Sequence, residues 1–409
     1  MTTSSERRAA TTTAIGSSAV LAPVREFEGT SRPSGDLPSV HLYTPSADPS
    51  GMGVHMRCLA EEYVRQGRHV TLMYWPNTNA ERLFAPAADR GVRLARIPHP
   101  RDPRFGTRIA EDLQRCPSDV FHLHVGTGRE NFDGARAAAS CGVPAIVQTL
   151  HLPWLIHNRR KRDAMLSALE PVDRVITVSD WQRATYEKVG VAAQRIVTVL
   201  NGVPHRAWSP GRAAARRELG LESGRHVVMT IGRLTSMKGH RYLLDAVPLL
   251  LRSSSDLVVV IVGEGDLRRA LRDQTERLGV AQAVRFAGHR TNARELLAAA
   301  DVFVLPSLHE GMPLTVLEAM DAGLPVVGTR VIGTSEAVED GVSGRLVPPG
   351  HPTALAEALT ELLSEPALRQ RMSVAGRQRY ERLFTATRMA RRTAAVYDEV
   401  LVPRAAVAS

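Results

Sequence analysis

Cysteine is scarce in this 409-residue chain, and its scarcity narrows the possible classes of protein. The cysteines, Cys58, Cys116 and Cys141, are far apart and odd in number, and there is no Cys-x-x-Cys pair or His/Cys cluster. A disulfide framework would need an even, closely spaced set, and a zinc site would need clustered ligands. We therefore expect a reduced, cytoplasmic protein.

Long hydrophobic runs are also missing. No apolar stretch approaches the roughly 18 residues that a membrane span needs, and the longest, residues 257–262, has the size of one buried strand. Near the N-terminus, Arg7 and Arg8 precede an Ala/Thr/Ser stretch that is too polar for the apolar region of a signal peptide. Residues 1–37 are rich in Ser, Thr, Pro and Gly, and this composition predicts a disordered tail.

Lysine is also scarce. The formal net charge is +10, and it comes almost entirely from arginine, because the only lysines are Lys161, Lys188 and Lys238. Such a charge is compatible with an anionic small molecule, a nucleic acid or an acidic membrane surface. The densest basic run comprises Arg159, Arg160, Lys161 and Arg162. Its ordinary interpretation is a solvated helix face, and the alternative is peripheral contact with a membrane.

From residue 38 onwards, short apolar runs alternate with segments of helical periodicity. In the first half the expected strands are residues 40–45, 69–75, 92–97, 119–125, 144–151, 174–179 and 195–201. After a Pro/Gly-rich stretch at 201–212, a second series follows at 226–232, 256–263, 283–288, 300–307, 325–329 and 343–349. This alternation favours parallel sheets covered by helices on both faces. We predict an α/β protein with domains at 38–205 and 206–385, and a C-terminal amphipathic helix within 386–409 that packs back on the first domain.

In open α/β sheets, ligands bind beyond the carboxyl ends of the strands, so residues that follow strands deserve the closest reading. Gly51 and Gly53 follow the first strand and would let backbone approach a ligand before a helix expected to begin near Val54; a tight turn is the ordinary interpretation. Arg233 and Lys238 lie between a buried strand and a helix. We interpret them as an anion-binding pair.

The stretch HEGMPLTVLEAM, residues 309–320, places a glutamate on each side of a Gly-Met-Pro turn. Pro313 suits the first position of a helix. The amides at this helix start, which would be free to bind phosphate, belong to Met312, Leu314 and Thr315. Glu310 and Glu318 could accept hydrogen bonds from sugar and ribose hydroxyls, although a glutamate near a helix start is more often simply solvated.

Three histidines lie on neighbouring expected strands. His122 and His124 alternate and therefore share a face, and His151 ends the next strand. A single strand histidine is usually structural, but two at neighbouring strand ends indicate a polar pocket. The sequence has no Ser-His-Asp order with a nucleophile elbow and no His-Glu-x-x-His motif.

Together these segments resemble the retaining glycosyltransferases of family 4 (glycosyl transferases group 1), over about residues 38–395. The most specific segments are GRLTSMKG, VGEGD, FAGHR, DVFVLPSLHEGMPLTVLEAMDAGLPVV and EDGVSGRLVPPG. The resemblance implies the GT-B architecture, in which two Rossmann-like doubly wound domains face each other. The chain departs from the family pattern at SGMG and IGTSE, where consecutive glycines are common, and this leaves the donor sugar open.

The resemblance also implies roles for residues that bind a nucleotide sugar. The residues it places at the donor diphosphate are Arg233, Lys238, Gly51, Gly53, Met312, Leu314 and Thr315. It places Glu318 at the ribose and Arg290 near the base.

At the reacting end, the resemblance places Glu310 and Gly311 at the donor sugar, with Glu310 and His151 as the catalytic residues. Glu310 could orient the donor or act as a nucleophile. His124 is a looser match on the acceptor side. No metal or other cofactor is implied.

The implied reaction moves a hexose or N-acetylhexosamine, from UDP in preference to GDP, to a hydroxyl of a small molecule with retention of configuration. A bacterial biosynthetic role, in specialised-metabolite, thiol or glycoconjugate formation, fits this reaction, and no nucleic-acid partner is expected. Three alternatives stay open: a lipid acceptor at the membrane surface, a sugar-nucleotide epimerase or hydrolase on the same scaffold, and a polyanion-binding protein without catalysis.

Overall fold

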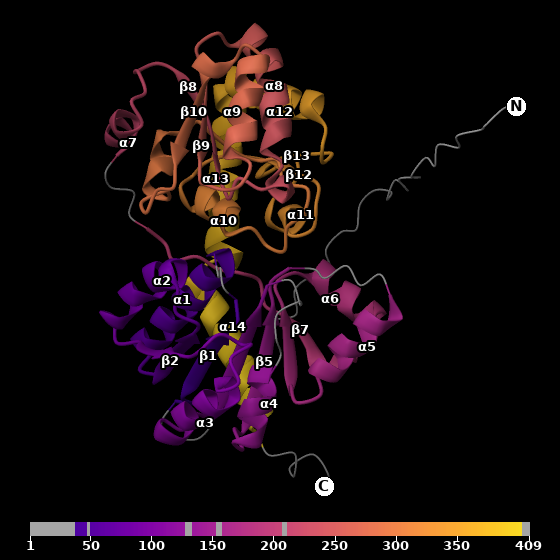
Figure 1. Ribbon diagram of the computed structural model, residues 1–409. Helices are drawn as coiled ribbons and strands as arrows, with labels where there is room; N and C mark the ends of the chain where they lie inside the picture. The colour runs from indigo at the N-terminus through magenta and orange to yellow at the C-terminus, as the bar shows by residue number, and fades with distance from the viewer. Residues whose placement is uncertain (1–36, 47–49, 127–132, 153–157, 207–210, 403–409) are drawn as a thin grey trace, which may run out of the picture.

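The computed structural model describes residues 37–402, apart from 47–49, 127–132, 153–157 and 207–210, and shows two α/β domains stacked one above the other (Figure 1). The disordered tail predicted at 1–37 lies, except for Leu37, outside the described residues.

The first domain is built on a seven-stranded parallel sheet with the order β3-β2-β1-β4-β5-β6-β7. Its strands are β1 (Val40–Thr44), β2 (Val70–Tyr74), β3 (Arg93–Arg96), β4 (Val120–Val125), β5 (Ala145–Leu150), β6 (Arg174–Thr177) and β7 (Ile196–Thr198). Its helices are α1 (Ser50–Arg65), α2 (Thr78–Ala88), α3 (Phe105–Arg115), α4 (Asp133–Ser140), α5 (Arg159–Ala168), α6 (Asp180–Lys188) and the 3₁₀ turn η1 (Ala193–Arg195).

The second domain repeats the plan with six parallel strands in the order β10-β9-β8-β11-β12-β13. These are β8 (His226–Ile231), β9 (Leu257–Val262), β10 (Val284–Gly288), β11 (Val302–Leu305), β12 (Val326–Thr329) and β13 (Gly344–Val347). The helices are α7 (Arg212–Glu218), α8 (His240–Ser253), α9 (Arg268–Arg277), α10 (Leu314–Asp321), α11 (Thr334–Ala337), α12 (Pro352–Ser364) and α13 (Pro366–Leu383), with 3₁₀ turns η2 (Ser236–Lys238), η3 (Ala281–Ala283) and η4 (Glu295–Ala299).

Burial on both faces explains why the central strands read as unbroken apolar runs. Every residue of β1, β4, β5 and β9 is buried, as expected for parallel strands covered by helices on each side. Each sheet accordingly separates two hydrophobic clusters, one under each helical layer. The α/β architecture predicted from the strand–helix alternation is confirmed.

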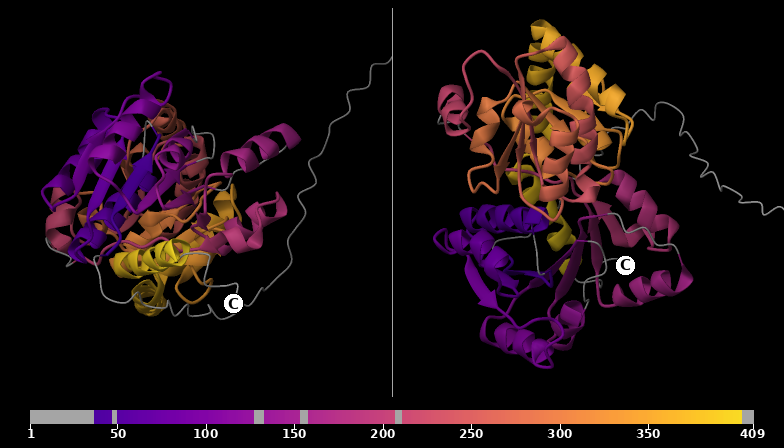
Figure 2. Two further views of the ribbon diagram at one scale, coloured as in Figure 1. Left: turned by 90° about the horizontal axis from the view of Figure 1, so that it is seen from below. Right: turned by 45° about the horizontal axis from the view of Figure 1, so that its top comes forward.

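The last helix, α14 (Ala386–Leu401), leaves the second domain and lies on the first. The yellow end of the chain runs down from the upper domain along the lower sheet in Figure 1 and in the right-hand view of Figure 2. Met389 and Val396 are buried in the same cluster as Leu42 of β1, and the Tyr63 hydroxyl of α1 donates to the Ala390 carbonyl at 3.2 Å. The predicted return of the chain to the first domain is therefore confirmed.

Strand order fixes where each domain can bind a ligand. In the first sheet the connections leave β1 towards β2 and leave β4 towards β5, so the order reverses between β1 and β4. In the second sheet the same reversal lies between β8 and β11. Loops diverge at such switch points and leave a crevice beyond the carboxyl ends of the strands. The segments after β1, β4, β8 and β11 are therefore the candidate site.

Two predicted helix starts were wrong by a few residues. Helix α1 begins at Ser50, four residues before Val54, so Gly51 and Gly53 lie in its first turn. Helix α10 begins at Leu314, and Pro313 is the cap that precedes it, with extended backbone at ψ 114°, rather than its first helical residue. Within the described residues, no helix is both long and apolar enough to cross a membrane.

Candidate active site

The segment after β11, at the switch point of the second sheet, contacts the first domain. The Asn201 side-chain amide donates to the Met312 carbonyl at 2.9 Å, which ties the end of the first domain to the segment before α10. A Cβ atom on Gly311 would lie 1.9 Å from the His151 carbonyl oxygen, and a Cβ on Gly333 would lie 1.8 Å from the Gly311 carbonyl. Backbone from both domains is packed so closely here that only glycine fits at Gly311.

Glu310 is the most constrained carboxylate of the site. It is 4% exposed, and its Oε1 accepts hydrogen bonds from the Lys238 ammonium at 2.6 Å and from the Ser307 hydroxyl at 2.6 Å. The backbone holds the same two loops together, since the Leu308 amide donates to the Met237 carbonyl at 2.7 Å. The structure therefore brings Lys238 and Glu310, 72 residues apart, into one ion pair at the switch point of the second sheet.

The other residues of the second domain predicted to bind phosphate lie in the two segments that carry this ion pair. Leu314 and Thr315 open α10 and are partly buried, and the first amides of a helix have no acceptor within it. Met312, two residues before Leu314, is buried. Arg233 follows β8 and is exposed. Helix α10 begins four residues after Glu310, the partner of Lys238, and a helix start together with a lysine has the charge that a diphosphate needs.

Glu318 is the fifth residue of α10 and is half-buried. Burial raises the pKa of its carboxyl, and Arg294 and Arg206 act in the opposite direction. The Glu318 charge also acts on the first domain, because it is one cause, after burial, of the raised pKa of the Cys58 thiol on α1. Glu318 therefore lies close enough to α1 for its charge to act on a side chain of that helix.

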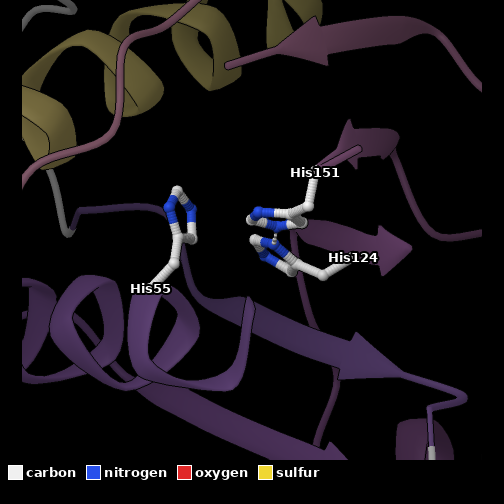
Figure 3. Close-up of side chains that lie close together, drawn as sticks. All are labelled: His55, His124 and His151. Atoms are coloured by element: carbon white, nitrogen blue, oxygen red, sulfur yellow. Dashed lines mark hydrogen bonds between the residues drawn. The ribbon is translucent and has the colours of Figure 1, made fainter. Parts of the chain in front are cut away.

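On the first domain, histidines from three elements converge (Figure 3). His124 is the penultimate residue of β4, His151 follows β5, and the His124 Nδ1 and His151 Nε2 atoms are 3.1 Å apart. His55 of α1 joins them, with ring centroids 4.7 Å from His151 and 5.4 Å from His124. All three are buried, and the role of His124 on the acceptor side stays a prediction. The prediction that His122 and His124 share a face is confirmed by ring centroids 4.1 Å apart.

Arg290 and the basic run at residues 159–162 are the two remaining features predicted from the sequence. Arg290 follows the edge strand β10; its Nε donates to the Ala287 carbonyl at 3.0 Å, and its guanidinium lies 3.8 Å from Glu218 of α7. The basic run opens α5, at the outer side of the first domain (Figure 1), and all four of its side chains are exposed.

The sequence did not single out His55, Asn201 and Glu336, which the structure adds to the site. The Asn201 Oδ1 lies 2.9 Å from His55 Nδ1. Glu336 of the second domain accepts the amides of Asp180 and Trp181 at 2.9 and 3.0 Å, and so caps the start of α6 across the domain boundary. His55 had a signal, because it lies four residues before Leu59 on the mostly apolar buried face of α1.

Comparisons with known proteins agree with this arrangement. The profile for glycosyl transferases group 1 matches residues 211–379, and that for Glycosyltransferase Family 4 matches residues 49–207. The chain is 33% identical over 378 residues to a glycogen synthase of Mycobacterium tuberculosis, covering 89% of this chain and 84% of that one. It is also 33% identical over 297 residues to a D-inositol 3-phosphate glycosyltransferase of Nocardiopsis dassonvillei, covering 66% and 68%.

Among solved structures, Anabaena HepE, crystallised with UDP, superposes with a TM-score of 0.75 at 20% identity, covering 88% of this chain and all of that one. This likeness concerns the fold, and it agrees with the two facing Rossmann-like domains seen here. By family profiles, sequence identity and fold, the chain belongs to the group 1 and family 4 glycosyltransferases of GT-B architecture.

Proposed function

We propose that the protein is a retaining glycosyltransferase that moves a hexose or N-acetylhexosamine from a nucleotide sugar, UDP in preference to GDP, to a hydroxyl of a small molecule. The observation that carries the proposal is the Lys238–Glu310 ion pair of 2.6 Å, set between the start of α10 and the His151 backbone. It offers a cation for a diphosphate and a carboxylate for a sugar at neighbouring points.

The chemistry follows from where charge develops. Breaking the bond between sugar and diphosphate builds negative charge on the leaving phosphate, which Lys238, Arg233 and the start of α10 would stabilise. The contacts between Gly311 and His151, and between Asn201 and Met312, would exclude water that otherwise hydrolyses the donor.

Within this reaction, Glu310 orients the donor sugar rather than attacking it. Lys238 and Ser307 both donate to Glu310 Oε1, and a carboxylate held by two donors is a poorer nucleophile but a fixed acceptor for a sugar hydroxyl. The acceptor hydroxyl then attacks from the face that the diphosphate leaves, which retains the configuration. His151 would contact the transferred sugar from the first domain, and no metal takes part.

A small polar acceptor in a cytoplasmic reaction fits best, and the similarity to a D-inositol 3-phosphate glycosyltransferase supports this class. A lipid acceptor at the membrane surface is the second candidate, because the four exposed cations of α5 could contact anionic headgroups.

A thermal-shift panel of UDP- and GDP-sugars, followed by product mass with candidate acceptors, tests the proposal. We expect UDP-sugars to raise Tm more than GDP-sugars, and transfer to require an acceptor. Epimerisation, or fast donor hydrolysis without acceptor, would instead assign the protein to the competing classes of enzyme.

A further inference from the structure

The histidine cluster of the first domain has a ligand-binding geometry of which the proposed transfer reaction uses only His151. One ring nitrogen from each of His55, His124 and His151 lies within 4.8 Å of the other two, and the three side chains point toward one another from α1, β4 and the segment after β5 (Figure 3). We propose that these three imidazoles form a site for one Zn²⁺-like ion, and that filling this site inhibits the enzyme.

The protonation state of His55 follows from its neighbours. The Met312 carbonyl can only accept a hydrogen bond, so the Asn201 NH₂ group faces it and the Asn201 oxygen faces His55. His55 Nδ1 must then carry the proton, and Nε2 keeps its lone pair. A histidine whose outer nitrogen donates to a fixed acceptor is the usual arrangement of a metal ligand.

His124 is fully buried, and its Nδ1, which shares a hydrogen bond with His151 Nε2, is the nitrogen that it would offer to the ion. Its other ring nitrogen, Nε2, has no hydrogen-bond partner among the described residues. His122, beside it, differs: its two nitrogens are paired with Tyr397 and Thr149 at 2.6 and 2.7 Å. It therefore supports the cluster and is not a ligand.

The distances fit a tetrahedral ion with modest movement. Two nitrogens bound to zinc at about 2.0–2.1 Å lie roughly 3.4 Å apart, and the His124 Nδ1 and His151 Nε2 atoms are already 3.1 Å apart. Binding would replace their mutual hydrogen bond and draw His55 inward by rotation of its side chain. Three histidines and one open position form a known zinc arrangement.

Inhibition follows from the place of His151. Its carbonyl contacts Gly311 of the second domain, and the proposed function assigns its ring to the transferred sugar. An ion that binds this ring removes it from the sugar and fixes α1 to the end of β5. The inhibition therefore rests on the proposed function, whereas metal binding itself does not.

Cobalt titration of the metal-free full chain tests the site, because Co²⁺ in a tetrahedral nitrogen site absorbs visible light strongly and surface-bound octahedral Co²⁺ does not. We expect one strongly absorbing Co²⁺ per chain, displaced by Zn²⁺. His55→Gln should abolish this absorption, Asn201→Ala should weaken binding about 10- to 100-fold, and His69→Gln, at an exposed histidine of the same domain, should leave it unchanged.

Weak octahedral Co²⁺ spectra in the wild-type protein would overturn the proposal, whatever the variants show. Equal Co²⁺ binding by the wild type and His55→Gln would also overturn it. UDP affinity is measured in parallel by calorimetry. If the protein binds Co²⁺ but not UDP, the metal site is supported and the proposed function is contradicted. If it binds UDP but not Co²⁺, the proposed function is supported and the metal site is contradicted.

Discussion

Replacing Lys238 with alanine tests whether this lysine binds the diphosphate of the donor and not the rest of it. The Lys238 ammonium is about one-fifth exposed and lies 2.6 Å from Glu310, at the switch point where a diphosphate would bind. A hydrogen bond to a charged group contributes about 1.5–3 kcal/mol, so we expect UDP to bind about 10- to 150-fold more weakly to Lys238→Ala. Uridine, which has no phosphate, should bind the variant and the wild type equally.

Calorimetric titration of UDP and uridine into both proteins makes this comparison. Lys188→Ala is the matched control, because Lys188 is an exposed lysine of the same chain, on α6 and far from the ion pair in sequence. Lys238→Ala leaves the Glu310 carboxylate without its cation, which should lower the stability of the protein. The double variant Lys238→Ala/Glu310→Gln removes this carboxylate, so it should regain stability without regaining UDP affinity.

The reasoning is refuted if UDP affinity is unchanged in Lys238→Ala. It is also refuted if uridine and UDP lose affinity equally, since the lysine would then act on the fold and not on the phosphates.

Three further predictions follow from single residues. Glu318→Ala should weaken UDP binding about tenfold by losing a charged hydrogen bond to the ribose, and calorimetry with a 2′,3′-dideoxy nucleotide should show no difference between variant and wild type. Asp321 is fully buried and pairs with Arg294 and Arg377, so Asp321→Asn should lower the free energy of unfolding by about 3 kcal/mol; a change below about 1 kcal/mol in urea denaturation argues against this role. His55 has a folded pKa of about 4 against 6.5 when unfolded, so only the unfolded state gains its proton between those values. Stability should therefore fall by about 3 kcal/mol as pH drops through this window, and urea denaturation at both ends should show a smaller fall for His55→Gln.

Most of the fold could be predicted because buried parallel strands have a simple signature. The run at residues 257–262 became β9, which is buried along its whole length, and the amphipathic end of the chain became α14. The start of α1 could not be predicted in the same way. Two glycines in four residues disfavour a helix locally, but Met52 between them is buried in the core of the first domain, and packing outweighs local propensity.

Some residues of the candidate site could likewise be predicted from the sequence, and others could not. Lys238 and Glu310 could be selected from sequence because each follows a strand of the same sheet, where switch-point geometry brings loops together. Asn201 and His55 could not, since their contact spans 146 residues and depends on how the end of the first domain packs against α1. Glu336 could not be predicted for a similar reason, because its partners, the amides at the start of α6, belong to the other domain.

The central claim is that the protein transfers a sugar from a nucleotide sugar with retention, and NMR of the reaction tests it most directly. Purified protein is incubated with a UDP-α-sugar and a panel of small hydroxylated acceptors while the anomeric signals are followed. The account predicts UDP release that depends on the acceptor, an α-linked product, and a large loss of both in Lys238→Ala. A β-linked product, or UDP release at the same rate without acceptor, would contradict it.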